Sequence, residues 1–340
     1  MATIRDVARL AGVSPSTASR ALNNNGQISA KTTAKVKAAM KKLNYSPNYA
    51  ARNLANRDSN TVAVVLPVRP ESVGNNPFFM QILQGICATC NTQGYLVSLA
   101  TGKTEEELLK NIQNLIRLGN VKLFIMAFAN ENDEIMDFLE KQEGVECVVI
   151  GHPAANEKVR YVDNDNYKAA ADAADYLLDQ GRTGIGYVYT DLNEMVQLDR
   201  YQGYWQTMAK HGRPYAKLNL GGHEDDENGV NLAKLKEFLR VHPQIKAFVA
   251  CDDVVGTRLQ QLLVRLGLDP SSYSLVSFNN SVFARLAHPA LTSMELFPKL
   301  LGAESAMLAI EGKNRTAAND KRRIIVPHKL VERKRNAEAD

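Results

Sequence analysis

Four residues near the start of the chain could read the edges of DNA bases. Pro15, Ser16, Thr17 and Arg20 would lie at the N-terminal end of a helix beginning at Pro15, the end that a recognition helix inserts into the major groove. The Arg20 guanidinium could fork onto O6 and N7 of guanine, whereas a serine hydroxyl could bond to several bases. Arg20 could instead contact a phosphate, which positions a protein without reading sequence.

A second candidate for contact with DNA is Leu54, in a short alanine-rich segment between residues 46 and 56. A segment of this length is marginal as an isolated helix and needs a partner to become ordered. Leu54 could enter a base step of the minor groove as an apolar wedge. The alternative is that Leu54 packs against the domain that follows the polar linker at 57–60.

The charge of the chain is concentrated at its start. Residues 1–60 hold ten Lys and Arg against two acidic residues, out of 41 basic and 37 acidic residues in all. The rest of the chain therefore carries more acidic than basic side chains. A basic head on a mildly acidic body predicts a polyanionic partner for the head alone.

A helix-turn-helix unit would position the candidate DNA contacts. Thr3 and Asp6 have the spacing of a capping box for a first helix, and Ser14-Pro15 suits the cap and first position of a second helix ending near Leu22. A third helix at about residues 30–43 can cover the first two. A three-helix bundle that does not bind DNA is the alternative, and the basic charge favours the DNA-binding unit.

Residues 3–55 resemble the DNA-binding headpiece and hinge helix of the LacI/GalR family of bacterial repressors, through residues 6–8, 11–14, 17–20, 44–48 and 51–54. The resemblance implies a headpiece over 1–46 and a hinge helix with linker over 47–60. It also implies that two hinge helices pair in the minor groove, with Leu54 as the intercalating leucine. We expect the DNA contacts to come from Thr3, Ser14, Pro15, Ser16, Thr17, Arg20, Asn23, Tyr45, Asn48, Ala51, Arg52 and Leu54.

From residue 61 short β-rich runs alternate with amphipathic helices. This alternation predicts parallel sheets covered by helices on both faces. So many strands would crowd a single sheet, and two lobes with a cleft at the carboxyl ends of their strands are favoured. We expect strands at 62–66, 96–99, 123–127, 147–150, 185–189, 247–250 and 275–278.

The body resembles the periplasmic-binding-protein-like core of the same family. Residues 161–167, 277–280 and 323–333 resemble one branch of it, the maltose-operon regulators of Gram-positive bacteria. The fold class implied is an N-terminal all-α helix-turn-helix headpiece plus an α/β core, 61–340, of two doubly wound lobes joined by three crossovers. The resemblance places about 61–162 and 292–321 in lobe 1, and about 163–291 and 322–340 in lobe 2.

A sugar effector needs carboxylates and amides for its hydroxyl groups and an aromatic face for its ring. Phe78 or Phe79 resembles a pocket-lining aromatic of the family, Asp165 occupies a position that faces the ligand, and Arg200 matches an arginine that contacts effector oxygens. Further polar candidates follow strand ends. The complete set of expected effector contacts is Phe78, Phe79, Asp165, Arg200, Asp252, Asp253 and Asn279.

Each effector candidate has a structural alternative. The phenylalanines could be plain core, Asp165 could be only a helix cap, Arg200 could form a surface salt bridge, and the others could cap loops. Cys251 stands where some sugar-responsive relatives carry an amide, so the sequence indicates the class of sugar better than its identity.

Other chemistry is not supported by the sequence. Cys87 and Cys90 match C-x-x-C but are expected well inside a helix, away from the N-terminus that lowers a thiol pKa. The six histidines form no set with metal-ligand spacing, and no catalytic triad is legible. We expect no metal, no cofactor and no catalytic residue. Four cysteines make no disulfide framework, and neither a membrane span nor a signal peptide is present, so we expect a cytoplasmic protein.

These observations predict a homodimeric transcriptional repressor that binds double-stranded operator DNA and is controlled by a saccharide of the maltose or maltodextrin class. Within the family, the alternative is a regulator controlled by a phosphoprotein corepressor. Outside it, the alternatives are a sugar-binding protein without gene regulation, against which the basic head argues, and an enzyme on the α/β core.

Overall fold

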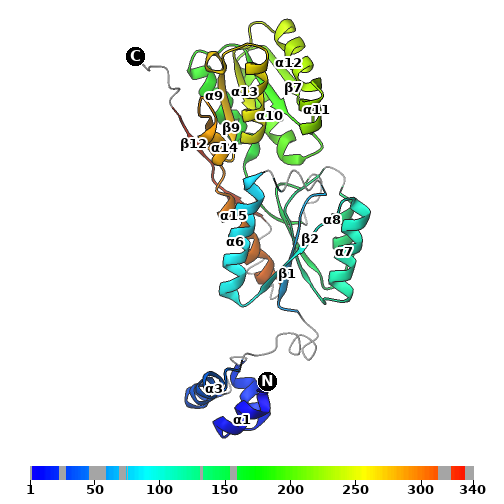
Figure 1. Ribbon diagram of the computed structural model, residues 1–340, viewed down its shortest axis with the longest axis vertical. Helices are drawn as coiled ribbons and strands as arrows, with labels where there is room; N and C mark the ends of the chain where they lie inside the picture. The colour runs from blue at the N-terminus through cyan, green and yellow to red at the C-terminus, as the bar shows by residue number, and fades with distance from the viewer. Residues whose placement is uncertain are drawn as a thin grey trace. The chain divides into compact units, whose positions relative to one another are not determined.

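The computed structural model describes residues 2–22, 28–45, 59–68, 74, 76–130, 133–153, 159–312 and 323–333. The chain divides into two compact units, a head unit, Met1–Ser59, and a core unit, Asn60–Asp340 (Figure 1). Each unit has its own apolar interior. Within the described residues no helix is both long and apolar enough to span a membrane.

The head unit contains the three predicted helices, α1 (Ile4–Ala11), α2 (Pro15–Leu22) and α3 (Ala30–Lys42). The Thr3–Asp6 capping box opens α1, and Gly12 ends it in the left-handed region, with φ 68°. Small residues at the contacts, including Ala8 and Ala18, pack against Val36 of α3. The three helices and their shared core confirm the helix-turn-helix prediction. Small side chains at these positions allow α1 and α2 to pack tightly.

The first lobe of the core unit is built on a six-stranded sheet of order β11-β5-β4-β3-β1-β2, in which all pairs are parallel. Helices α6 and α15 cover one face, and α7 and α8 cover the other (Figure 1). The elements are β1 (Thr61–Val65), α6 (Pro77–Gln93), β2 (Leu96–Ala100), α7 (Glu105–Arg117), β3 (Leu123–Met126), α8 (Glu134–Glu140), β4 (Glu146–Ile150), β5 (Arg160–Asn164), α15 (Pro298–Gly312) and β11 (Arg323–Val326).

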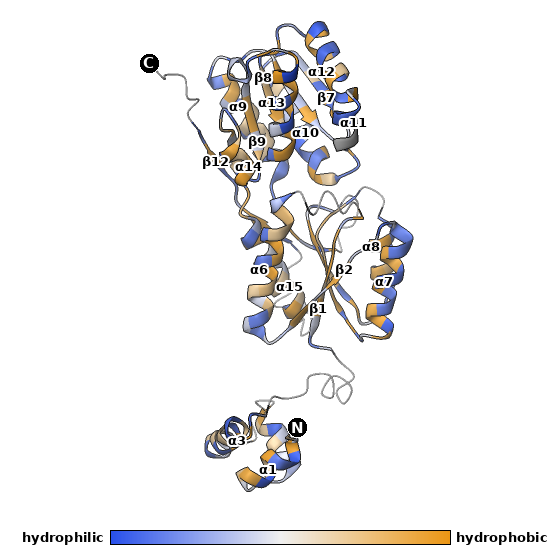
Figure 2. Ribbon diagram, viewed as in Figure 1, coloured by the Kyte–Doolittle hydropathy of each residue, from blue (hydrophilic) through white to orange (hydrophobic). Residues whose placement is uncertain are grey.

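Alternate residues of strand β1 face the two covered sides of the sheet. Val62 and Val64 pack with α6 and α15, whereas Ala63 and Val65 pack with α7 and α8. The covering helices α7 and α8 carry both hydrophobic and hydrophilic residues, as expected of helices with one solvent face (Figure 2). Helices α6 and α15 approach closely at Gly85, where a Cβ would lie 2.0 Å from the carbonyl oxygen of Lys299.

The second lobe is built on a six-stranded sheet of order β12-β10-β9-β8-β6-β7, with only the β10–β12 pair antiparallel among the described strands. Its elements are α9 (Asn166–Asp179), β6 (Ile185–Tyr189), α10 (Met195–Lys210), β7 (Tyr215–Asn219), α11 (His223–Glu227), α12 (Val230–Val241), β8 (Ala247–Ala250), α13 (Asp253–Arg265), the 3-10 helix η1 (Pro270–Ser272), β9 (Ser274–Phe278), α14 (Val282–Leu286), β10 (Thr292–Glu295) and β12 (Lys329–Val331).

The chain crosses between the lobes three times, after β5, after β10 and between β11 and β12. The buried Asn164 amide joins all three crossovers, because it ends β5 and its Nδ2 donates to the carbonyl oxygens of Leu296, at 3.1 Å, and Val326, at 2.9 Å. The two-lobe fold class and the number of crossovers agree with the sequence prediction.

Two of the expected lobe boundaries are wrong. Residues 292–295 were expected in lobe 1, but as β10 they pair with β9 in the second sheet. Residues 323–326 were expected in lobe 2, but as β11 they pair with β5 in the first sheet. Only Pro327 and His328 separate β11 from β12. One β-rich stretch therefore contributes a strand to each sheet, and its sequence does not show where the chain passes from one lobe to the other. Strands β5, β7, β10, β11 and β12 were also missing from the expected set.

Candidate functional site

Arg200 is the centre of the candidate effector site. It lies on α10 with only 4% of its surface exposed. Its Nε donates to Oδ1 of Asn166 at 2.9 Å, and its Nη1 donates to the carbonyl oxygen of Cys251 at 2.5 Å. The guanidinium carbon is 4.4 Å from the centre of the Phe278 ring, a cation–π contact. Burial lowers the Arg200 pKa. The surface salt bridge considered for Arg200 is therefore wrong.

These contacts place Arg200 at the carboxyl edge of the second sheet. Cys251 directly follows β8 and Phe278 ends β9, which are adjacent strands. Ligands of open α/β sheets bind at this edge, beyond the carboxyl ends of the strands. Nη2 of Arg200 donates no hydrogen bond to any residue that the structure describes. With Nε–H and one Nη1 hydrogen in use, three of the five N–H donors remain for a ligand.

Asp252 joins the second lobe to the first at the same edge. Its Oδ1 accepts from the backbone N–H of Val255 at 2.8 Å and so caps α13. Its Oδ2 accepts from Nδ2 of Asn76 at 3.1 Å, and Asn76 in turn caps α6 of the first lobe. The N-terminal ends of two helices from different lobes are thus linked, and burial raises the Asp252 pKa.

The two phenylalanines of α6 differ in their surroundings. Phe78 is half-buried and packs against the apolar cores of both lobes, whereas Phe79 packs against that of the first lobe. Their rings form an edge contact with centres 5.9 Å apart. Phe78 therefore lies where the two lobes meet.

Asp165 and Asn279 take different positions at this edge. Asp165 is exposed and caps α9, accepting from the backbone N–H of Lys168 at 2.8 Å. Asn279 directly follows β9 in the left-handed region, with φ 94°, and is 6% exposed. Its side-chain amide makes no hydrogen bond within the described part of the chain, so it retains both donors and an acceptor for a ligand.

Asp253 was expected to contact the effector, and the structure gives it another role. Its carboxylate is 1% exposed and accepts from Ser277 Oγ at 2.5 Å, Ser293 Oγ at 2.7 Å and the backbone N–H of Ser281 at 2.6 Å. These contacts join α13 to β9 and β10 inside the second lobe. Because protein donors already surround this carboxylate, we remove Asp253 from the effector set.

Several residues of the site escaped the sequence prediction. Asn166 and Phe278 contact the Arg200 side chain, and Asn76 bonds to Asp252. Asn166 lies within 161–167, which resembles the family, and Asn76-Pro77 is a helix-start signal. Neither signal indicates a tertiary partner.

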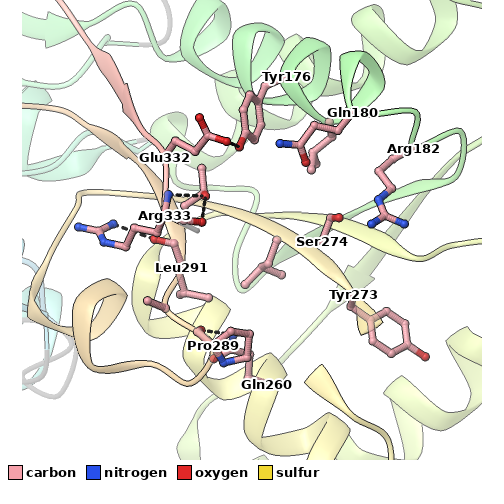
Figure 3. A pocket seen from close by; sticks show the side chains of 14 residues that line it. Tyr176, Gln180, Arg182, Gln260, Tyr273, Ser274, Pro289, Leu291, Glu332 and Arg333 are labelled. Carbon is pink, nitrogen blue, oxygen red and sulfur yellow. Dashed lines mark hydrogen bonds between the residues drawn. The ribbon is translucent and has the colours of Figure 1, made fainter. Parts of the chain in front are cut away.

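A separate cavity of about 390 Å³ lies in the second lobe, between the end of α9, the start of β9 and Glu332-Arg333 (Figure 3). None of the expected effector residues lines it. Most of the expected effector residues gather instead near the carboxyl edge of the second sheet.

The residues of the head unit that are expected to read DNA lie largely on its surface. Ser14, Pro15, Ser16 and Arg20 are exposed, and Thr17 is half-buried. Ser14 Oγ caps α2 by accepting from the Thr17 N–H at 3.1 Å. Every Lys and Arg among the described residues of this unit is exposed, as binding to phosphates requires.

Two expected DNA contacts also have structural roles. Thr3 caps α1, and Tyr45 packs against the head core. The expected contacts Asn23, Asn48, Ala51, Arg52 and Leu54 lie outside the described residues, as does most of the hinge segment 47–60.

The C-x-x-C pair lies within α6, as predicted. Burial raises the Cys90 pKa to about 11, the opposite of an activated thiol. In the part of the chain that the structure describes, no group of three or more His, Cys, Asp or Glu side chains could hold a metal ion.

Comparison with known proteins agrees with both units. Residues 3–48 match the family described as "Bacterial regulatory proteins, lacI family", and residues 174–334 match a periplasmic binding protein-like domain. The HTH-type transcriptional regulator MalR of Staphylococcus xylosus is 32% identical over 330 residues, which is 92% of this chain and 93% of the relative. The chain belongs to the LacI family.

Other LacI-family relatives place the chain among transcriptional regulators and not enzymes. The regulator CelR of Thermobifida fusca is 28% identical over 97% of both chains. A solved CelR–cellobiose complex has a TM-score of 0.71 and 25% identity over 98% of this chain and all of that one. The Lac repressor dimer bound to operator has a TM-score of 0.76 with 20% identity over 98% of both chains, and so shares the fold. The protein is a LacI-family DNA-binding transcriptional regulator.

Proposed function

We propose that this regulator represses transcription as a homodimer on a pseudo-palindromic DNA operator, and that a saccharide of the maltose or maltodextrin class controls its operator affinity. As a protein that acts on bacterial chromosomal DNA, it would work in the cytoplasm. The observation that carries the effector assignment is the buried Arg200, which lies against an aromatic ring at the carboxyl edge of the second sheet.

The geometry suits a polyol better than an apolar ligand. The planar Arg200 fork can hold two sugar oxygens through its remaining donors, and the amide of Asn279 can donate or accept. The Phe78 ring offers an apolar face. The proposed effector contacts are Phe78, Phe79, Asp165, Arg200, Asp252 and Asn279.

The branch of the family supports the maltose class. MalR regulators are among the relatives at 30% identity or more, and the CelR structure carries cellobiose, another glucose disaccharide, on the same fold. The Cys251 thiol is buried, and burial raises its pKa. The backbone carbonyl oxygen of Cys251 accepts a hydrogen bond from Arg200. A thiol donates only weakly, so hydroxyl contacts at this position must come from other groups.

The DNA assignment rests on the exposed face of α2. Ser14, Pro15, Ser16, Thr17 and Arg20 are proposed to meet the major groove, and Arg20 is proposed to read a guanine. Thr3, Asn23, Tyr45 and Asn48 would support this face at the phosphates. The hinge residues Ala51, Arg52 and Leu54 would enter the minor groove when two chains pair.

The full-length chain tests these assignments directly. We expect isothermal titration calorimetry to detect binding of maltose or maltotriose, and a gel-shift titration on a selected operator to show that the sugar changes DNA affinity. Cellobiose and galactose serve as comparison sugars. If only cellobiose binds, the effector belongs to the cellobiose class and not to the maltose class. If none of these sugars binds, the saccharide assignment is overturned in favour of control by a partner protein.

A further inference from the structure

Two buried residues flank the turn from β5 to α9 and connect to the Arg200 side chain, Asp163 in β5 and Asn166 at the start of α9. Asn166 is 3% exposed and Asp163 is 6% exposed. Nδ2 of Asn166 donates to Oδ1 of Asp163 at 2.9 Å, and Oδ1 of Asn166 accepts from Nε of Arg200, also at 2.9 Å. A chain of two hydrogen bonds therefore runs from the carboxylate to the guanidinium.

Chemistry fixes the direction of this chain. An ionised carboxylate can only accept hydrogen bonds and a guanidinium can only donate them. The Asn166 amide must therefore turn its NH₂ group to Asp163 and its carbonyl oxygen to Arg200. Without Asp163, Nδ2 of Asn166 would keep only its longer bond to the carbonyl oxygen of Asn164, at 3.4 Å, and the amide would be held less firmly against the guanidinium.

The same turn is anchored to the rest of the lobe junction. Asn164 lies between the two residues and donates to the carbonyl oxygens of Leu296 and Val326 in the other two crossovers. The chain of bonds that ends at Arg200 thus begins at the point where all three crossovers meet.

Burial, modified by the charges around Asp163, makes the ionisation of this carboxyl group sensitive to pH near neutrality. From α10 it faces Asp199, which disfavours ionisation, and Arg200, which favours it. On β11 its register partner is the apolar Ile325. Arg200 itself faces Tyr187 on β6, Cys251 after β8 and Asp252 at the cap of α13. Burial dominates this balance and raises the Asp163 pKa to about 7.

We propose that Asp163 and Asn166 are positioning residues of the effector site, which aim the Arg200 guanidinium at the saccharide and hold it most firmly when Asp163 is ionised. A hydrogen bond to an ionised acceptor is roughly twice as strong as a neutral one. Effector affinity should therefore rise with pH across neutrality. This change in affinity is measured with sugar bound at Arg200, so the proposal rests on the proposed function.

The test is calorimetric titration of the full-length chain with maltose, maltotriose and cellobiose at pH 6, 7 and 8. For the wild type we expect affinity to rise by about three- to tenfold over this range, because one carboxyl group changes ionisation. Asn166→Ala should weaken binding by about tenfold. Asp163→Asn keeps an acceptor for Asn166 but cannot ionise, so its affinity should vary little with pH.

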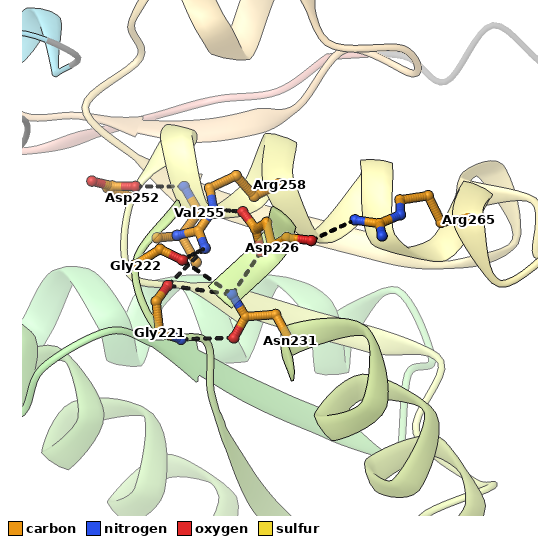
Figure 4. A network of polar contacts seen from close by, with 8 residues as sticks. All are labelled: Gly221, Gly222, Asp226, Asn231, Asp252, Val255, Arg258 and Arg265. Atoms are coloured by element: carbon orange, nitrogen blue, oxygen red, sulfur yellow. Dashed lines mark hydrogen bonds and ion pairs between the residues drawn. The ribbon is translucent and has the colours of Figure 1, made fainter. Parts of the chain in front are cut away.

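A matched control separates positioning from a general loss of stability. Asn231 is another buried amide of the second lobe, bonded to the Gly221 N–H at 2.8 Å and to Asp226 Oδ1 at 2.6 Å, among contacts that do not include Arg200 (Figure 4). Asn231→Ala should bind sugar like the wild type. In an Arg200→Lys background, Asn166→Ala should cause little further loss, because the residue it positions is already gone.

The outcomes are distinguishable. If the wild type binds none of the three sugars, the proposed function falls and the positioning role falls with it. If the wild type binds but Asn166→Ala matches it, or Asn231→Ala weakens binding equally, the positioning role alone is overturned. Independent losses for Asn166→Ala and Arg200→Lys, or an unchanged pH profile in Asp163→Asn, would also overturn it.

Discussion

The head unit and the core unit expose their functional groups in opposite ways. In the head, the basic side chains and the polar residues at the start of α2 lie on the surface. In the core, Arg200 is buried and held by two hydrogen bonds and an aromatic ring of the chain itself. The head suits a large polyanion that supplies its own shape, whereas the core suits a small ligand that must find its contacts already in place.

This contrast predicts that salt acts mainly on the head. If about six phosphates are neutralised, operator affinity should fall roughly 10³-fold between 50 and 200 mM salt. Fluorescence anisotropy on labelled operator DNA at several salt concentrations measures the slope. Sugar affinity should change little over the same range, and an operator affinity that is flat with salt would contradict the DNA assignment.

Burial of ionisable groups in the core makes its stability depend on pH. Since the folded pKa of Asp163 is about 7 against 3.8 for an ordinary Asp, the folded state keeps a proton that the unfolded state releases. The free energy of unfolding should therefore fall as pH rises from about 4 to 7. The Asp163→Asn variant lacks this ionisation. Denaturant unfolding should therefore show its free energy of unfolding rising relative to that of the wild type by roughly 2–4 kcal/mol between pH 4 and pH 7. A gap that is constant with pH would contradict the raised pKa.

Arg200→Lys breaks the pre-arranged core site with the smallest chemical change. Lysine keeps the charge but cannot form the planar fork, so sugar affinity should weaken about ten- to hundredfold. Calorimetry with maltose measures the loss, and gel shifts should find sugar-free operator binding near that of the wild type. Arg240→Lys is the control, because Arg240 is an exposed residue paired with Glu237. Equal losses in both variants would make Arg200 a structural residue.

Arg20→Ala sharpens the comparison within the head. If Arg20 reads a guanine, the variant should lose about 1–3 kcal/mol on the selected operator and far less on random DNA. Arg9→Ala serves as the control, since Arg9 is exposed, lies on α1 and pairs with Asp6. Competition gel shifts with operator DNA and with random DNA measure the loss for each variant. Equal losses for Arg20→Ala on both DNAs would assign Arg20 to a phosphate.

The sequence by itself determined the local structure of this protein. The residues that start and end the head helices are strong local signals, and α2 runs from Pro15 to Leu22 as predicted. The buried strands of both lobes are short apolar runs, and their alternation with helices requires covered parallel sheets. Local signals were sufficient here because capping and periodicity act within a few residues.

Only the tertiary structure decided which lobe each late strand joins and which polar residues form the site. Strands β10, β11 and β12 are three or four residues long, and they are defined by neighbours that are remote in the chain. Asp252 and Asp253 are adjacent in sequence, yet one meets Asn76 of the other lobe and the second is enclosed by serines of its own lobe. Asp252 is the extended N-cap of α13 and Asp253 is its first helical residue, so the two carboxylates point in different directions and their roles depend on what packs around each.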